Sequence, residues 1–199
     1  MATTASTAPA TTGRATTPTL VACLAGFAAV VMASAGLGGA YAYTRYALRR
    51  SNPGEPFFPV TMPFNNYAAF VVFLTFILAS LSVGWAITCL RVGNRRWAGG
   101  GFGFAILANL ASANIIWFVG NQWEGAANAL PWWLHAYALL TLAGIACALA
   151  LVASALALAR IITAQSTGEQ PHSVIGASWF QHGALCVWTV VYLLIFLYK

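Results

Sequence analysis

The distribution of charge is the feature that most constrains this chain. Its nine basic and three acidic residues, in a chain of 199, all fall outside five long uncharged stretches, which are 15–44, 56–90, 97–123, 125–159 and 170–198. Each stretch contains an apolar run longer than the roughly 20 residues with which an α-helix crosses a bilayer core of about 30 Å. A charge at the centre of a membrane helix costs about 2.5–3.5 kcal/mol on insertion scales, so charges are displaced to helix ends. The pattern predicts five membrane-spanning helices.

Composition leads to the same fold class. The chain is 60% hydrophobic and 6% charged, whereas soluble proteins are about 25% charged. A soluble fold of this length would expose much of its apolar surface to water. We therefore predict an all-α polytopic membrane protein whose five transmembrane helices form one bundle, with no room for a soluble domain.

The helix bounds are expected where apolar runs meet arginines, prolines or polar turns. The predicted spans cover about 18–48, 66–91, 98–119, 131–162 and 174–198. Residues 1–17 are rich in Ala, Thr and Ser, so we expect a disordered N-terminal tail ahead of a transmembrane domain at 18–199. The positive-inside rule places the N-terminus inside, because that side would then hold five basic residues against four outside.

The formal net charge of +6 does not indicate nucleic-acid binding. The arginines cluster at predicted helix ends, where lipid headgroups lie. Basic residues do not alternate with aromatic residues on a soluble face, as they do in many nucleic-acid-binding proteins. The expected partner of these arginines is membrane lipid.

The predicted spans contain few groups that could carry chemistry. Glu55, Glu124 and Glu169 fall in loops or at helix ends, and the four cysteines show no metal-binding spacing. Pumps and channels usually place ionisable groups inside the bundle, and no catalytic constellation is present. We predict no catalytic centre and no metal site in this chain. Asn109 and Asn114 lie inside the third span and are expected to form interhelical hydrogen bonds.

Two histidines leave alternatives open. His135 lies at the start of the fourth predicted span, and His182 lies about two turns into the fifth. Two histidines from two helices can ligate a b-type haem, which would make the chain a small independent haem-b or quinone-binding redox protein. Alternatively, each histidine hydrogen-bonds to a neighbouring helix or to an interfacial lipid. The lack of flanking arginines for the haem propionates favours the second reading.

The last span carries the most specific pattern in the chain. His182 and Trp188 are six residues apart, and an aromatic-rich end follows at 192–198. His135 opens the fourth span, a proline-rich loop precedes the second, and Arg95-Arg96-Trp97 opens the third. Over about 18–199 these features resemble subunit III of the haem–copper oxidases, the cytochrome c and quinol oxidases, in its short five-helix form.

The chain departs from the pattern of that family at several positions, and the acidic residue usual in the helix corresponding to 18–48 is missing. Gln181 and Leu185 stand where the last helix usually has a tryptophan and an aspartate, and Ala138 stands where a second histidine is usual. The resemblance is therefore to a divergent member of the family.

The resemblance implies an accessory, non-catalytic subunit of a respiratory terminal oxidase, which stabilises the catalytic subunit and holds phospholipid. Haem and copper would belong to larger partner subunits of the subunit I and II type. In that family lipid lies in a cleft between the first two helices and the other three. The implied location is an energy-transducing membrane, either the bacterial plasma membrane or the mitochondrial inner membrane. The expected lipid-binding residues are Arg45, Arg49, Arg91, Arg96, His135 and His182.

The first span also carries many small residues. Gly26 and Gly36 are ten positions apart, close to three helical turns, and are expected to share one face. Gly39 and four alanines, at 22, 25, 29 and 33, widen this face. Small residues let membrane helices approach closely, and the resemblance favours a partner subunit as the occupant of part of the face.

Overall fold

A computed structural model describes residues 17–54, 65–124, 131–163 and 172–197. The helices are α1 (Thr17–Ser51), α2 (Asn66–Arg91), α3 (Arg95–Glu124), α4 (Pro131–Ile162), α5 (His172–Val191) and a short π-helix, η1 (Tyr192–Leu197). No strand occurs in these ranges. Five helical segments, the last made of α5 and η1, are long and apolar enough to cross a membrane. The predicted all-α, five-helix membrane fold is confirmed.

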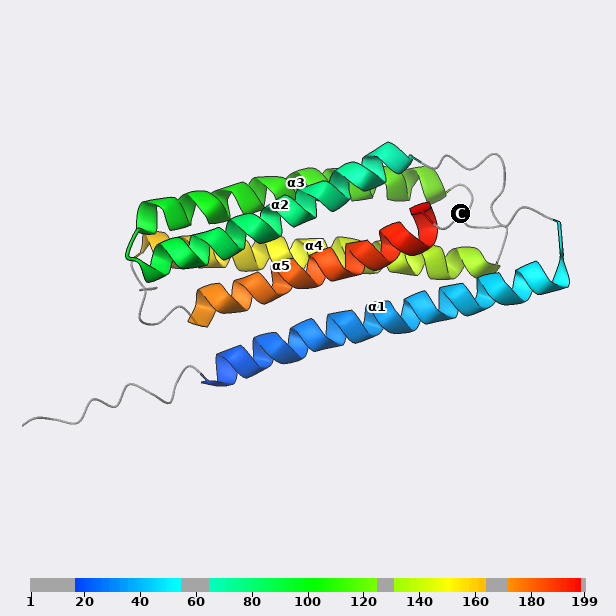
Figure 1. Ribbon diagram of the computed structural model, residues 1–199, viewed down its shortest axis with the longest axis horizontal. Helices are drawn as coiled ribbons and strands as arrows, with labels where there is room; N and C mark the ends of the chain where they lie inside the picture. The colour runs from blue at the N-terminus through cyan, green and yellow to red at the C-terminus, as the bar shows by residue number, and fades with distance from the viewer. Residues whose placement is uncertain (1–16, 55–64, 125–130, 164–171, 198–199) are drawn as a thin grey trace, which may run out of the picture.

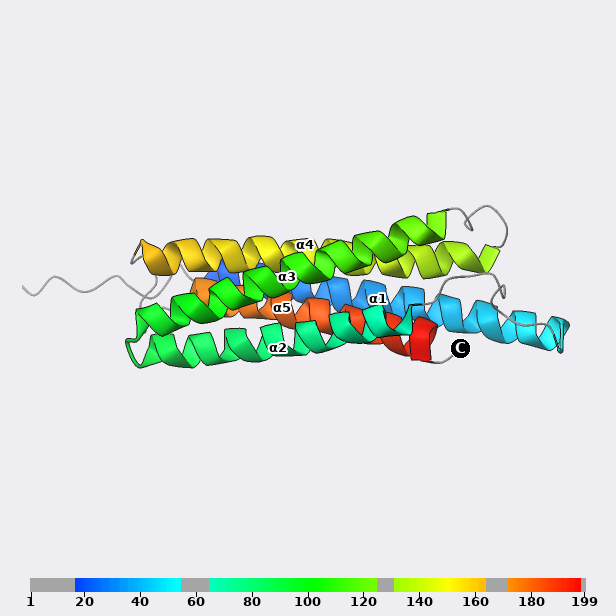
Figure 2. The same cartoon turned by 90° about the horizontal axis from the view of Figure 1, so that it is seen from above.

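Successive helices run in opposite directions, so the bundle has two ends (Figure 1). We call the end where α1 begins the N side and the end where η1 finishes the C side. Helices α2 to α5 form a four-helix bundle, because α2 packs on α3, α3 on α4, α4 on α5, and α5 again on α2. Helix α1 lies outside this bundle, alongside α5 and in lesser contact with α4 (Figures 1 and 2).

The peripheral position of α1 differs from the arrangement that the oxidase family implies. Helix α2 packs on α3 and α5 rather than on α1, so within the described residues the first two helices do not form a pair that stands apart from the other three. Only 6% of the most apolar window of α1 is buried, compared with 33% to 44% in the other four spans. Most of the surface of α1 is therefore available to lipid or to another protein.

The observed helix bounds agree with those predicted from the sequence in two spans and differ from them in the others. Helices α2 and α4 have the expected limits, whereas α1 continues to Ser51 and α3 runs from Arg95 to Glu124. At about 1.5 Å per residue the 35 residues of α1 measure about 52 Å, and its end projects beyond the other helices on the C side (Figure 1). The predicted disordered tail lies outside the described residues, apart from Thr17, as does most of the proline-rich loop.

The turn between α2 and α3 is set by a glycine. Gly93 has a φ of 80°, a left-handed conformation that costs little only without a Cβ. The Asn94 N–H donates to the carbonyl of Cys89 at 2.9 Å, as in the Schellman motif that ends many helices. The Asn94 side chain accepts a hydrogen bond from the Trp97 N–H at 3.4 Å, which explains why α3 begins earlier than position 98.

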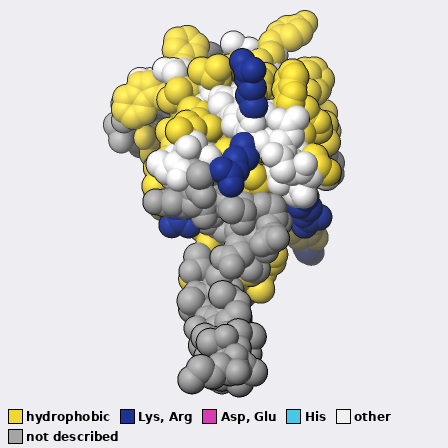
Figure 3. Space-filling view, turned by 90° about the vertical axis from the view of Figure 1, so that its left-hand side faces the viewer, with side chains coloured by type: hydrophobic (Ala, Val, Ile, Leu, Met, Phe, Trp, Pro, Cys, Tyr) yellow, Lys and Arg dark blue, Asp and Glu magenta, His cyan; other side chains and the backbone are white. Residues whose placement is uncertain are grey.

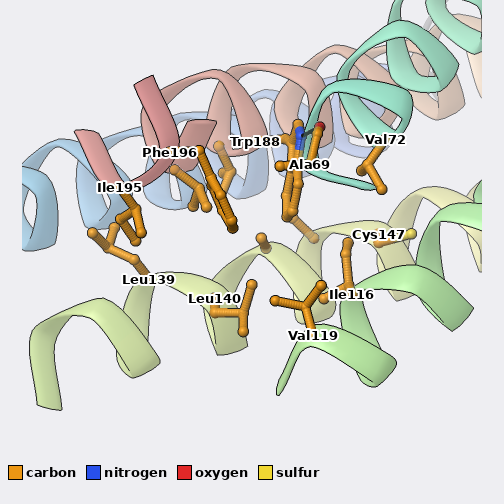
Figure 4. Packing of buried hydrophobic residues seen from close by; sticks show 14 of the residues in the cluster. Ala69, Val72, Ile116, Val119, Leu139, Leu140, Cys147, Trp188, Ile195 and Phe196 are labelled. Carbon is orange, nitrogen blue, oxygen red and sulfur yellow. Dashed lines mark hydrogen bonds between the residues drawn. The ribbon is translucent and has the colours of Figure 1, made fainter. Parts of the chain in front are cut away.

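The C-side half of the core is built around aromatic rings. Trp188 is fully buried, and its indole N–H donates to the backbone carbonyl of Ala69 at 3.1 Å. Its ring lies 6.3 Å from that of Phe196. Figure 4 shows Trp188 and Phe196 pointing toward Leu140 and Val119, so that α2, α3, α4, α5 and η1 meet in one cluster.

The N-side half is packed through small residues instead. Gly101 of α3 faces α2 so closely that a Cβ placed on it would lie 2.7 Å from the Ala86 Cβ and 2.9 Å from the Ser82 carbonyl oxygen. The Ser82 hydroxyl donates to the Gly101 carbonyl at 2.9 Å. This close approach resembles the small-residue contacts by which membrane helices associate.

The last turn differs from the α-helix that the sequence predicts to 198. From Tyr192 onward the chain forms the π-helix η1, and such turns are rare outside special sites. Ile195 and Phe196 are both buried in the aromatic cluster. The wider turn lets two successive bulky side chains enter the core, which an α-helix at the edge of a bundle does less easily.

Candidate lipid and partner surfaces

The arginines expected to bind lipid fall on two opposite ends of the molecule. Arg49 is exposed on the C side, whereas Arg91 and Arg96 are exposed on the N side. Figure 3 looks onto the N side and shows several basic side chains around this end. Since the two ends are separated by the full span of the bundle, these residues form no common site. Each can meet only the headgroups of its own leaflet.

Arg45 does not face the headgroup region. Its side chain is 5% exposed, and its Nη1 donates to the backbone carbonyl of Leu194 at 3.4 Å. Leu194 lies in η1, where the change in hydrogen-bonding register redirects backbone carbonyls. Helix α1 thus turns this guanidinium inward against the C-terminal turn, and the binding of a lipid phosphate by Arg45 stays a prediction.

The two histidines lie at different depths. His182 is exposed on α5, and its neighbour Gly183 lines a small cavity with Ala146 of α4. His135 precedes Ala146 on α4 by a length of about 16 Å at about 1.5 Å per residue. Two axial ligands of one haem must reach the same iron, which this separation does not allow. The half-buried His135 and the exposed His182 are thus separate surface groups.

A polar contact lies inside the bundle between α3, α4 and α5. Asn109 and Gln181 are both 0% exposed, and the Asn109 Nδ2 donates to the Gln181 Oε1 at 2.8 Å. The Cys147 thiol donates to the backbone carbonyl of Asn109 at 3.3 Å. The predicted interhelical role of Asn109 is confirmed. That of Asn114 is wrong, because its side chain is exposed and donates to Leu110 of its own helix.

Sequence reasoning missed the part played by Gln181. From the sequence, Gln181 stood out only because the oxidase family usually has a tryptophan at this position. Its amide is the only acceptor for Asn109 Nδ2 among the described residues. The signal was present in the sequence, since a glutamine inside an apolar span needs a buried partner.

The amide pair leads to a stability prediction. Gln181→Leu removes the acceptor of Asn109 Nδ2 and leaves a buried donor unpaired, which we expect to cost about 1–2 kcal/mol. The double variant Asn109→Leu/Gln181→Leu removes both groups and is expected to be more stable than Gln181→Leu alone. Unfolding of the three proteins by sodium dodecyl sulfate in mixed micelles measures the difference. A double variant less stable than the single one would contradict the pairing.

Among the residues that the structure describes, two grooves on the outward surface stand out. One, of about 170 Å³, lies on the N side between α1, α4 and α5, with Arg160 and Cys23 at its rim. The other, of about 420 Å³, lies between the C-side halves of α3 and α4. The second groove is lined by Ala113, Ile116, Trp117, Gly120, Asn121, Tyr137, Leu140, Thr141, Gly144, Ile145 and Ala148.

The small residues of α1 divide between two faces. A Cβ at Gly26 would meet Phe180 of α5 at 3.5 Å, whereas Gly36 and Gly39 have nothing within 4 Å. Gly26 and Gly36 therefore do not share a face, because ten residues turn about 80° short of three full turns. Of the small residues singled out in the sequence, six are exposed, and we call these six the outer face of α1: Ala22, Ala25, Ala29, Ala33, Gly36 and Gly39.

No group of three or more His, Cys, Asp or Glu side chains within the described part of the chain could hold a metal ion. Comparison with known proteins yields no family model that matches the chain and no match among curated proteins.

Proposed function

We propose that this integral membrane protein is an accessory subunit that docks on a larger polytopic protein. The observation that carries the proposal is the position of α1. It lies outside the four-helix bundle, has 6% of its apolar window buried, and turns alanines and glycines outward. Such residues give little contact area to mobile lipid chains but allow another helix to approach closely.

The larger protein is, in this proposal, the catalytic subunit of a haem–copper terminal oxidase. Support comes from the sequence resemblance to subunit III and from the places that two of its residues take. Trp188, which keeps the family spacing from His182, fixes the core by its hydrogen bond to Ala69. His182 lies on the exposed side of the same helix, where it is available to a lipid or a partner. Haem and copper belong to the partner subunits of type I and II.

Phospholipid is the second partner in this proposal. Arg91 and Arg96 on the N side, and Arg49 on the C side, place guanidinium groups where phosphate oxygens of the two leaflets lie. Arg45 is left out of this set, since it is bonded to Leu194. The membrane is an energy-transducing one, with the bacterial plasma membrane as the first choice and the N side facing inward.

The separation of His135 and His182 along the bundle weighs against the alternative of an independent haem-b protein. Purification of the tagged chain in a mild detergent, followed by identification of the chains that accompany it, tests the proposal. A larger polytopic chain in fixed ratio is expected. A chain isolated without any larger partner would contradict it.

The outer face of α1 gives a more specific prediction. Gly36 has nothing within 4 Å, so Gly36→Leu is expected to leave the bundle intact while blocking the close approach of a partner helix. Co-purification of the larger subunit should fall sharply, with unchanged helix content by circular dichroism. Gly84→Leu is the matched control, because Gly84 of α2 is exposed and also has nothing within 4 Å. Survival of the complex in Gly36→Leu would show that this face is not the docking surface.

A further inference from the structure

The groove between the C-side halves of α3 and α4 has the dimensions of a binding site. Its volume of about 420 Å³ lies within the range of about 300–1,000 Å³ that is usual for small ligands. Ile116 and Leu140, both buried, lie at its base, and the exposed Trp117 stands at its edge. It is open because Gly120 and Gly144, on the two facing helices, carry no side chain that would fill it.

The groove is confined to one leaflet of the bilayer. It runs along α4 from Tyr137 to Ala148, a length of about 16 Å at about 1.5 Å per residue. Half of the hydrocarbon core is about 15 Å thick. Toward the N side, the next residues on the same faces of α3 and α4 are Leu110 and Val152. Both have large, exposed side chains. These side chains end the groove near the middle of the membrane.

Most polar groups of the groove lie toward its C-side end, and the deeper Thr141 donates its hydroxyl to the Tyr137 carbonyl of its own helix at 2.9 Å. Asn121 and Tyr137 lie close to the C-side ends of their helices, whereas Ile145 and Ala148 lie deep in the span. None of the lining residues carries a charge. With polar lining residues toward the interface and apolar ones toward the midplane, the groove fits a ligand with an uncharged or zwitterionic polar end. Such a ligand would place its polar end at the interface and one apolar chain toward the midplane. A partner helix fits less well, because it would continue past Leu110 and Val152.

We propose that this groove binds one acyl chain of a phospholipid from the C-side leaflet, with the headgroup beside Asn121 and Tyr137. The site is distinct from the helix-end arginines of the proposed function, and its occupancy requires no partner subunit. Recognition is by packing of the chain between α3 and α4. A zwitterionic and an anionic phospholipid with the same chains are therefore bound equally well.

Gly144→Leu is the variant that fills the groove. A Cβ at Gly144 has Ile116 Cγ2 at 3.8 Å as its nearest neighbour, an ordinary contact, so the helix pair can accept it. Gly103→Leu on α3 is the matched control, because Gly103 has nothing within 4 Å and does not line the groove. Ala148→Leu, at an exposed position within the groove, is a second filling variant that decides the case if Gly144→Leu fails to fold.

The experiment counts retained lipid by native mass spectrometry of the full chain in detergent with added palmitoyl-oleoyl-phosphatidylcholine. The wild-type chain and Gly103→Leu are expected to retain one lipid, and Gly144→Leu to bind it about tenfold more weakly, or about 1.4 kcal/mol. Equal retention by the filled variants, or no retention by the wild type, would overturn the proposal. So would retention of phosphatidylglycerol alone that is lost in high salt, since that result assigns the lipid to the arginines.

Discussion

Replacing Gly101 by leucine is expected to have the largest effect of any single change in the bundle. Even a single Cβ added at this position would lie 2.7 Å from the Ala86 Cβ and 2.9 Å from the Ser82 carbonyl oxygen. Neither of these neighbours can rotate away, because one is a short side chain and the other is backbone. Overpacking of cores costs about 1–3 kcal/mol when side chains can adjust, so we expect at least about 3 kcal/mol here.

Separation of α2 from α3 would also break the hydrogen bond from Ser82 to the Gly101 carbonyl. The measurement is the midpoint of unfolding by sodium dodecyl sulfate, together with the yield of folded protein from membranes. Gly100→Leu is the control, because Gly100 precedes Gly101 on the same helix, is exposed and has nothing within 4 Å. Equal behaviour of the two variants would mean that α2 and α3 do not approach each other as closely as described.

The second large effect is expected from Arg45→Glu. The guanidinium is buried and donates to the Leu194 carbonyl, so the substitution removes a donor and brings a carboxylate toward a carbonyl oxygen. Loss of a hydrogen bond to a charged group costs about 1.5–3 kcal/mol, and an unpaired buried charge adds to this. We expect a loss of about 3 kcal/mol or more in stability, with release of η1 from α1.

Arg50→Glu provides the comparison for that change. Arg50 is exposed in the last turn of the same helix, where reversing its charge alters mainly the interaction with the helix dipole, about 0.3–1 kcal/mol. Thermal unfolding followed by circular dichroism measures both variants. Amide hydrogen exchange at Ile195 and Phe196 should rise in Arg45→Glu alone. Unchanged protection there would show that Arg45 does not hold the C-terminal turn.

The five spans could be predicted because charge and hydropathy report directly on the cost of placing a side chain in lipid. The bounds of α2 and α4 coincided with Arg91 and Pro131, which are themselves end signals. The order in which the helices pack was not predictable in the same way. In lipid the outward and inward faces of a helix are equally apolar, so periodicity did not reveal that α1 is peripheral.

The candidate site residues were predictable only in part. Arg49, Arg91 and Arg96 are exposed at helix ends as expected, since a surface charge needs no specific neighbour. Arg45 is on the same helix as Arg49, but its burial depends on the π-helix η1 some 150 residues away, and no local pattern announces that turn. The pairing of Asn109 with Gln181 likewise joins positions 72 residues apart.

In the proposed function this chain has no redox centre of its own and serves a complex that has one. The direct measurement is the reduced-minus-oxidised visible spectrum of the isolated assembly, compared with that of the chain after its release from the partner by a stronger detergent. Haem bands are expected in the assembly and in the separated larger subunit, with none in the released chain. Stoichiometric haem that stays with this chain, or an assembly without haem, would contradict the account.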